Sequence, residues 1–253
     1  MKREFPILEF DPAREAVLNP RAKKPKDLPD RAVLCFFREV VERFARERQA
    51  KVVHRIDWED GRHLIYETEW EGRRVAFMQP GVGAPVASGF MEELIPHGIR
   101  TFVACGGAGT LFSELKVGQV ILPTAAVRDE GTSYHYLAPS REVEAQPEVN
   151  AVLRQVLEER AVPFKEGKTW TTDAPYRETR DKVMMRREEG CLTVEMETAA
   201  LLAVAQFRGI RFGQYLYAGD DVGGAEWDSR GWSKRGDVRS ALFELALAAC
   251  VKL

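Results

Sequence analysis

The sequence predicts an α/β fold: a single domain of three layers, α/β/α, around a mixed central sheet. Short apolar runs of strand type alternate with glycine turns and helical patterns, which is the order typical of α/β proteins. A stretch of partly alternating residues at 52–80 predicts hairpin strands as well. From Ala199 to Ala205 no residue is polar, which indicates a helix buried on most sides.

The elements follow in order along the chain. Residues 1–30 contain several prolines and a basic cluster in NPRAKKPKDLPD, which is typical of an extended arm. The α/β domain predicted for residues 31–253 begins with a buried strand at 31–37 and a helix at 38–48. The later predicted elements are hairpin strands near 52–57, 63–70 and 73–80, helices at 87–99 and 147–162, strands at 100–105, 119–127, 164–172 and 191–194, the buried helix, a strand at 211–219 and a helix from about 234 to the C-terminus.

Composition narrows the classes of function. The chain has 253 residues, of which 45% are hydrophobic and 30% charged, so it can bury a large core. A net charge of -2 gives no general attraction to nucleic acid or to an anionic membrane. No apolar run reaches spanning length and MKREFPILEFDP lacks a signal-peptide core, so we expect a cytoplasmic protein.

The cysteines do not have the spacing of a metal site. Cys35, Cys105, Cys191 and Cys250 stand far apart among apolar neighbours, with no CxxC pair. We expect reduced, buried thiols and no bound metal.

Two glutamates stand at the start of the buried helix. Glu195 and Glu197 follow the apolar strand CLTV, and carboxylates enclosed at such a junction must find hydrogen-bond donors or become neutral. One explanation is helix capping, because acidic groups offset the positive end of the helix dipole. The other is a ligand with adjacent hydroxyl groups, which supplies two donors at once. The residues alone leave both explanations open.

Three glycine-containing segments are expected to meet at one edge of the sheet. They are GVGAP (81–85), CGGAG (105–109) and GDD (219–221), each of which follows a predicted strand. Paired glycines let backbone N–H groups approach an anion or a sugar, although short glycine runs after strands are also ordinary turns. Asp220 stands at the usual position of a catalytic or binding side chain, with turn formation as the alternative.

The order of these motifs resembles the nucleoside phosphorylase family. The matching segments are GVGAP, EELIPHGIRTF, CGGAG, VGQVILPTAAVRDEG, TTDAPY, VEMETAALLAVA and AGDD, from about Val75 to Asp221. The family includes uridine phosphorylase, purine nucleoside phosphorylases and methylthioadenosine nucleosidase, and VEMET is the most specific element. The resemblance implies a nucleoside phosphorylase-like fold that works as a homo-oligomer, a dimer or a hexamer, and uses no cofactor.

The resemblance also implies roles for single residues. The second glutamate of VEMET accepts hydrogen bonds from ribose hydroxyls and the methionine packs against the sugar, which assigns these roles to Glu197 and Met196. In purine-cleaving relatives an aspartate at the position of Asp220 donates a proton to the base, and an expelled base does need its negative charge neutralised. Pyrimidine-specific relatives generally lack it, so we expect a purine. Further substrate-binding residues are expected to be Glu195, Tyr176, Gly106, Gly107 and His135.

The phosphate site of the phosphorolytic relatives is changed in this chain. Ala104 stands where they have an arginine, Gly107 replaces a threonine or serine, and their early Gly-Asp-Pro turn is not found near VLCFFREVVERF. Gly83 and Arg38 are the expected phosphate-binding residues, with a solvated helix position as the alternative for Arg38.

The sequence therefore predicts a pentosyltransferase that cleaves the N-glycosidic bond of a ribonucleoside, with phosphate as co-substrate, in purine salvage. One alternative is a nucleosidase that uses water, with Glu39 as the general base. Another is a nucleoside-binding homologue that keeps the fold and has lost the chemistry.

Overall fold

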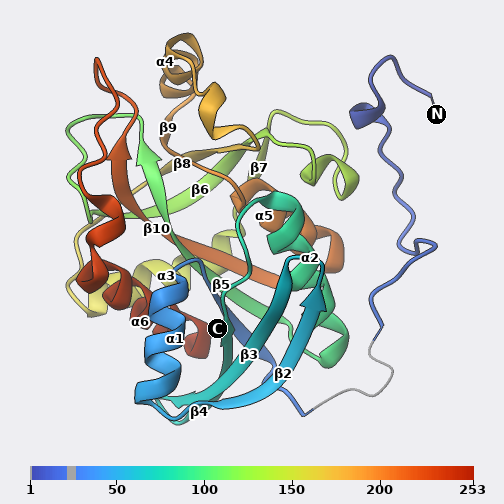
Figure 1. The fold of residues 1–253 in the computed structure, drawn as a ribbon. Coiled ribbons are helices and arrows are strands. Elements are labelled where there is room, and N and C mark those ends of the chain that lie inside the picture. The colour runs from blue at the N-terminus through green and yellow to red at the C-terminus, as the bar shows by residue number, and fades with distance from the viewer. Residues whose placement is uncertain (1, 22–26) are drawn as a thin grey trace.

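In the computed structural model, which describes residues 2–21 and 27–253, ten strands form one mixed sheet (Figure 1). The strands are β1 (Arg31–Cys35), β2 (Lys51–Trp58), β3 (Gly61–Trp70), β4 (Arg73–Met78), β5 (Thr101–Thr110), β6 (Val120–Asp129), β7 (Glu142–Glu144), β8 (Phe164–Thr172), β9 (Cys191–Glu195) and β10 (Arg211–Asp221). The helices are α1 (Arg38–Glu47), α2 (Ala84–Leu94), α3 (Pro147–Glu159), α4 (Arg180–Glu188), α5 (Thr198–Arg208) and α6 (Gly236–Lys252).

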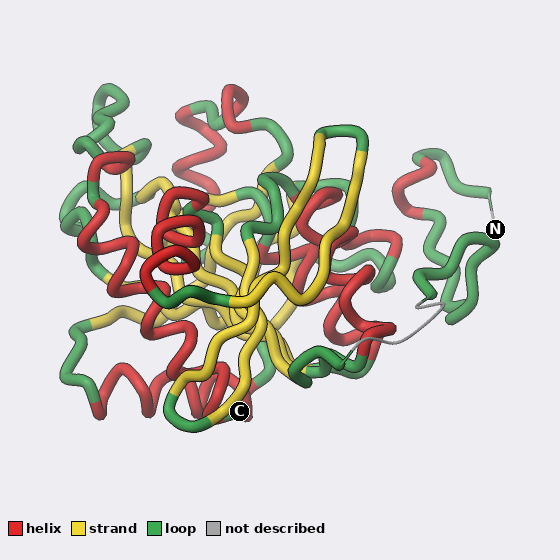
Figure 2. Tube along the Cα trace, turned by 60° about the horizontal axis from the view of Figure 1, so that its bottom comes forward, coloured by secondary structure: helices red, strands yellow, loops and turns green. Residues whose placement is uncertain are grey.

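Helices cover the sheet on both sides, which confirms the three-layer prediction. Apolar residues of α1, α3 and α6 pack in one buried cluster against β1, β5 and β10. The second cluster contains the apolar faces of α2 and α5, on the other side of the same strands. Figure 2 shows the strands passing between helices on both sides. As predicted, α5 is buried almost all round, because its residues 199–205 are all apolar and have no polar face to turn to solvent.

The sheet is mixed because some strands are joined by hairpins and others by crossover connections. β2, β3 and β4 form consecutive antiparallel pairs, whereas β1 runs parallel to β4 and β5. At the other end, β5 pairs with both β10 and β9, and the chain of pairs from β10 through β6 and β8 to β9 closes a ring of strands. This closure brings the ends of β5, β9 and β10 to one place.

Two segments expected to be loops are parts of strands. The glycine run after Cys105 continues β5, since its backbone pairs with β10 as far as Ala108 and again at Thr110, and with β9 at Gly109 and Thr110. Asp220 and Asp221 likewise lie at the end of β10. The helix α4 was not expected from the sequence, because RDKVMMRRE is largely charged and has no clear apolar stripe.

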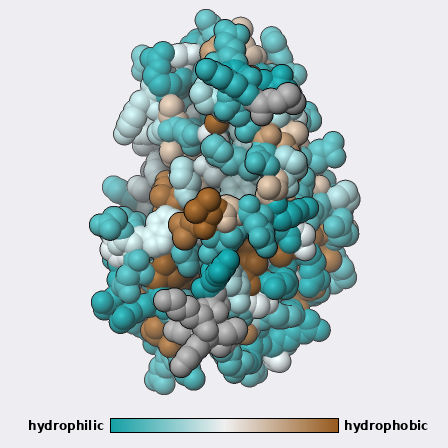
Figure 3. All heavy atoms as spheres, turned by 90° about the vertical axis from the view of Figure 1, so that its right-hand side faces the viewer, coloured by the Kyte–Doolittle hydropathy of each residue, from teal (hydrophilic) through white to brown (hydrophobic). Residues whose placement is uncertain are grey.

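The N-terminal arm lies outside the sheet over residues 2–21 (Figure 2). It contains one short 3-10 turn at Pro6–Leu8, and the Arg14 guanidinium stacks 4.6 Å from the ring centre of Phe207 on α5. The face that carries the arm is mostly hydrophilic, with apolar side chains near its middle (Figure 3). Lys23, Lys24 and Lys26 of the predicted basic cluster lie outside the described residues.

All four cysteines are buried and none forms a disulfide. Across residues 2–21 and 27–253, none of the helices is both long and apolar enough to cross a membrane.

Candidate active site

Glu195 caps the buried helix α5. Its Oε2 accepts the backbone N–H groups of Glu197 and Thr198, each at 2.7 Å, and its Oε1 accepts the Thr171 hydroxyl at 2.6 Å. These N–H groups belong to the first turn of the helix, where the backbone has no partner of its own. Burial raises the pKa of Glu195, and the three donors work against that shift. The protein itself engages both oxygens, so the contact of Glu195 with substrate stays a prediction.

Glu197 presents an oxygen that the protein does not use. The side chain is buried, and its Oε1 accepts the N–H of Gly83 at 2.6 Å. Among the described residues no donor reaches Oε2 in normal hydrogen-bond geometry, although the Met196 N–H also acts on this carboxyl group and lowers its pKa. Burial raises the pKa of Glu197 to about 8, and the neighbouring charge of Glu195 adds to this rise. A ligand that donates hydroxyl groups to Oε2 would stabilise the charged form. Met196 lies half-buried between the two glutamates.

Gly83 links the first glycine segment to this carboxylate. It precedes α2 and adopts a φ of 101°, a backbone conformation that favours glycine. Its N–H points to Glu197, so the amide expected to hold phosphate serves the predicted ribose-binding residue in this structure.

Asp220 lies at the end of β10, close to Gly109 of β5. Trp227 donates its indole N–H to Asp220 Oδ2 at 2.7 Å, and no donor among the described residues reaches Oδ1. A methyl group placed on Gly109 would lie 3.6 Å from Oδ1 and 3.0 Å from the Val194 side chain, so the ring closure brings β5, β9 and β10 into contact here. Asp220 therefore has one anchored oxygen and one free oxygen.

Asp221 has a structural role. Its carboxylate accepts the N–H groups of Gly223 and Gly224 at 2.8 and 3.2 Å and the Arg230 guanidinium at 2.6 Å. Burial raises the pKa of Asp221, but these contacts and the nearby Ser113 side chain outweigh it, so the pKa lies below its ordinary value. Asp221 thus forms the turn that sequence analysis had considered for Asp220.

Glu178 is a further acidic group at this edge, and it was not predicted from the sequence. It lies between the short turn Pro175–Arg177 and α4, in the charged stretch YRETRD. Its side chain interacts with the charge of Asp220, and its carboxyl group takes part in no hydrogen bond within residues 2–21 and 27–253. Burial, followed by the charge of Asp220, raises the pKa of Glu178 to about 7. No residue pattern marks it, because its neighbours in sequence are also charged.

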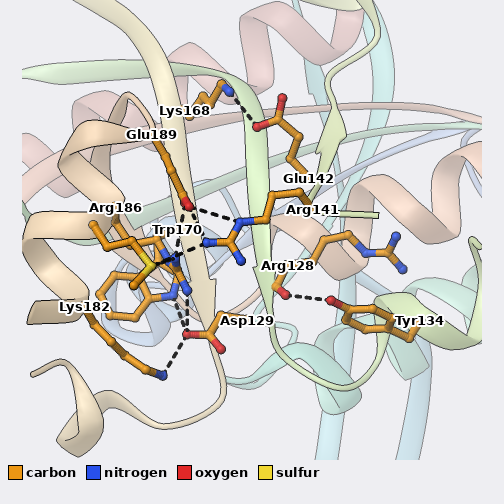
Figure 4. A network of polar contacts seen from close by, with 11 residues as sticks. Arg128, Asp129, Tyr134, Arg141, Glu142, Lys168, Trp170, Lys182, Arg186 and Glu189 are labelled. Atoms are coloured by element: carbon orange, nitrogen blue, oxygen red, sulfur yellow. Dashed lines mark hydrogen bonds and ion pairs between the residues drawn. The ribbon is translucent and has the colours of Figure 1, made fainter. Parts of the chain in front are cut away.

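An ion-pair network holds α4 against the sheet (Figure 4). Asp129 at the end of β6 accepts the Trp170 indole N–H at 3.0 Å, the Lys182 ammonium at 3.1 Å and the Arg186 guanidinium at 3.3 Å. Glu189 binds Arg186 and Arg141 at the other side of the network. Because α4 is anchored, the segment 173–179 that precedes it has a fixed end.

Aromatic rings cover the glycine run of β5. A methyl group on Gly106 would lie 3.2 Å from the Phe36 ring, and one on Gly107 would lie 3.1 Å from the Tyr217 ring. The small residues thus make room for these rings. Tyr217 in turn accepts a hydrogen bond from Arg239 at 3.3 Å and donates to the carbonyl oxygen of Trp232 at 2.9 Å.

The arginines near this run are engaged in ion pairs. Arg239 is buried and binds Glu39 at 2.6 Å. The Arg38 side chain is 79% exposed and binds Glu42 at 2.8 Å, which is the solvated helix position that sequence analysis held as its alternative. The role of Arg38 in phosphate binding stays a prediction.

The remaining predicted residues lie at the surface. Tyr176 is 98% exposed, and His135 is exposed on the short helix at Ser133–His135. Their contacts with substrate stay predictions. No cluster of His, Cys, Asp or Glu large enough to hold a metal ion occurs among the described residues.

The mixed sheet with its closed ring, covered by helices on both sides, defines the class as α/β proteins, with carboxylates at one edge of the sheet. The chain belongs to the phosphorylase superfamily, whose family model matches residues 30–250. This match confirms the resemblance predicted from the motif order.

Relatives named for purine and for pyrimidine nucleosides are both similar to this chain. A guanosine phosphorylase of Halorubrum lacusprofundi is 31% identical over 153 residues, 60% of this chain and 63% of that protein. The uridine phosphorylase of Escherichia coli is 30% identical over 162 residues, 58% of this chain and 64% of that protein. A DeoD-type purine nucleoside phosphorylase of Bacillus cytotoxicus is 27% identical over 194 residues, 75% of this chain and 80% of that protein. The chain thus spans slightly less than two thirds of the first two relatives.

Solved structures share the fold. The uridine phosphorylase of Vibrio fischeri ES114 superimposes with a TM-score of 0.75 at 20% identity, covering 90% of this chain and 94% of that one. An AMP nucleosidase of Bacteroides thetaiotaomicron VPI-5482 gives 0.72 at 21% identity, covering 88% and 87%. At these identities the likeness shows the fold alone.

Proposed function

We propose that this protein cleaves the N-glycosidic bond of a purine ribonucleoside. The observation that carries the proposal is Glu197, a buried carboxyl group with one oxygen held by Gly83 and the other left for a ligand. Ribose hydroxyls are suitable donors, because a carboxylate only accepts hydrogen bonds and two hydroxyls on adjacent carbons can reach it together. Their donation would offset the burial that raises the pKa of Glu197.

Asp220 is the proposed acid. As the bond between C1′ of the sugar and the base nitrogen breaks, its electron pair goes to the base, and Asp220 delivers a proton to the purine ring nitrogen. Trp227 fixes one carboxyl oxygen at 2.7 Å and so orients the other. The sugar becomes an oxocarbenium-like cation, which buried carboxylates stabilise electrostatically.

Phosphate is the acceptor that the resemblance implies, and the product is then ribose 1-phosphate. A specific observation favours water as a second candidate. Phe36 and Tyr217 pack on the glycines of β5, and the buried Arg239 is bound to Glu39. The protein itself therefore already engages the glycine run and the arginine nearest to it, which a phosphate group would otherwise contact. With water as the acceptor, the water oxygen forms the new bond to C1′ of the sugar, and the water gives up one proton. Glu39 is the proposed acceptor of that proton.

A nucleoside panel tests the proposal. The protein is incubated with purine and pyrimidine nucleosides, with and without phosphate, and released base and sugar are separated by chromatography. Phosphate-dependent release of ribose 1-phosphate supports phosphorolysis, and free ribose in phosphate-free buffer supports hydrolysis. Saturable binding without release of any base would refute the enzymatic proposal and leave a nucleoside-binding protein.

We further propose that the protein acts in purine salvage in the cytoplasm, as a homo-oligomer. The family resemblance supports the assembly.

A further inference from the structure

Arg239 is a buried cation at the start of a helix, where a positive charge is unfavourable. The residue is 7% exposed and lies in the first turn of α6, which begins at Gly236. The positive end of the helix dipole disfavours a cation in this turn, and a buried guanidinium without an anion is costly. Arg239 therefore requires an anionic partner.

The anion that Arg239 has in this structure comes from the surface. Nη1 of Arg239 donates to Glu39 Oε1 at 2.6 Å, and the Glu39 side chain is 53% exposed, against 9% for that of Arg239. A half-exposed carboxylate loses little when it leaves an ion pair, because water solvates it and its rotamer freedom returns. The buried guanidinium loses much more. Exchange of Glu39 for another anion is thus less costly than leaving Arg239 unpaired.

The contacts around Arg239 leave one edge of its guanidinium for such an anion. The rings of Phe37 and Trp232 lie 4.9 and 5.2 Å from its Cζ, and Nε donates to the Tyr217 hydroxyl at 3.3 Å. Within residues 2–21 and 27–253, Nη2 donates no hydrogen bond. Nη1 and Nη2 together form the fork that binds two oxygens of a single oxyanion, and Glu39 uses only half of it.

The N-terminal ends of two helices add to this preference for an anion. Glu39 lies in the first turn of α1, and Arg239 in that of α6. The helix dipoles therefore favour negative charge at the point where the two side chains meet. A phosphate group carries more negative charge than a carboxylate near neutral pH, so it gains more from the same surroundings.

We propose that the pair of Glu39 and Arg239 is an exchangeable oxyanion site. A phosphate group displaces Glu39 and binds Nη1 and Nη2 of Arg239, while Tyr217 keeps the guanidinium in place through Nε. The inference goes beyond the proposed function, in which Arg239 only holds Glu39. It concerns binding alone, so it can be measured without a nucleoside.

Isothermal titration calorimetry of the full chain with inorganic phosphate, at an ionic strength kept constant with chloride, tests the site. In Glu39→Gln the dissociation constant should fall about tenfold, because phosphate no longer has to displace a charged acceptor. Glu42→Gln makes the same change of charge on the same helix, where Glu42 pairs with the exposed Arg38, and should stay within about twofold of the parent. Arg239→Lys keeps the charge but lacks the fork, and should weaken binding about tenfold or more.

Three results would overturn the inference. They are phosphate binding by Glu39→Gln that is no tighter than that of Glu42→Gln, parent-like affinity in Arg239→Lys, and no binding of millimolar phosphate by either the parent or Glu39→Gln. Circular dichroism checks that each variant is folded, and the two glutamate variants decide the matter if Arg239→Lys is not. The expected pattern of phosphate binding without cleavage of any nucleoside would refute the proposed function and leave this inference standing. Cleavage without that pattern would do the reverse.

Discussion

Glu197→Gln is the sharpest test of the ribose site. The substitution keeps the shape of the side chain, and the amide oxygen can still accept the Gly83 N–H that lies 2.6 Å from Oε1. The amide nitrogen then takes the place of Oε2. It donates instead of accepting, so it cannot receive a ribose hydroxyl. The fold should survive while the sugar contact is lost.

The size of the effect follows from the burial of this carboxylate. A hydrogen bond to a charged group contributes about 1.5–3 kcal/mol. Since about 1.4 kcal/mol corresponds to a factor of ten, kcat/KM for a ribonucleoside should fall by about 10-fold to 150-fold. The effect should be larger for ribonucleosides than for 2′-deoxynucleosides, which offer one hydroxyl fewer.

The assay compares initial rates of base release from a ribonucleoside and its 2′-deoxy analogue, for the parent, for Glu197→Gln and for Glu188→Gln. The last variant carries the same chemical change at an exposed site and should behave like the parent. If Glu197→Gln cleaves both substrates at the parent's rates and in the parent's ratio, the ribose contact is absent and the reasoning from burial is wrong.

Further outcomes are expected from the same contacts. Asp220→Asn should slow cleavage of natural purine nucleosides by ~10²–10⁴-fold, yet spare a nitrophenyl riboside whose leaving group needs no proton; equal rates on natural substrates would make Asp220 a mere turn residue. The folded pKa of Glu197, about 8 against an ordinary 4.5, means that the folded state binds more protons in this window, so the free energy of unfolding should fall as pH rises from about 5 to 8. Glu197→Gln should lack that contribution, of the order of 3 kcal/mol, and urea denaturation at both pH values measures it. Thr171→Val removes the hydroxyl that donates to Glu195 and accepts from the Ala199 N–H, and should lower the free energy of unfolding by about 1–3 kcal/mol in the same experiment. Sedimentation at low micromolar concentration should give a dimer or hexamer; the mass of one 28.6 kDa chain would exclude both.

Much of the fold could be predicted from the sequence, because burial imposes a pattern on the residues that form it. Partial alternation at 52–80 marked the hairpins, and the apolar run at 199–205 marked α5. Glu197 and Asp220 could be singled out because each follows an apolar strand, and the motif order then supplied the family.

The rest depends on contacts between distant segments. Neither glutamate is marked as a cap by its sequence position; in the structure Glu195 accepts the first N–H groups of α5 and the hydroxyl of Thr171, 24 residues earlier in sequence. Glu178 belongs to a charged stretch without pattern, and α4 is held by ion pairs with Asp129 together with one buried apolar residue, Val183, which is too little to form an apolar stripe. The glycines of β5 resemble a loop in sequence, since the rings that fill the space above them come from elsewhere in the chain.

The closed ring of strands also limits how copies of this chain can aggregate. A strand with unpaired backbone groups invites addition of another chain, and closure removes such edges for β5, β6, β8, β9 and β10 over their paired lengths. Within the described residues, the sheet ends at β2 and at the short β7. β2 carries Lys51, Arg55 and Asp57 along an exposed face, and charges of this kind oppose strand-to-strand addition. Replacing them with apolar residues would turn this edge into a starting point for fibrils.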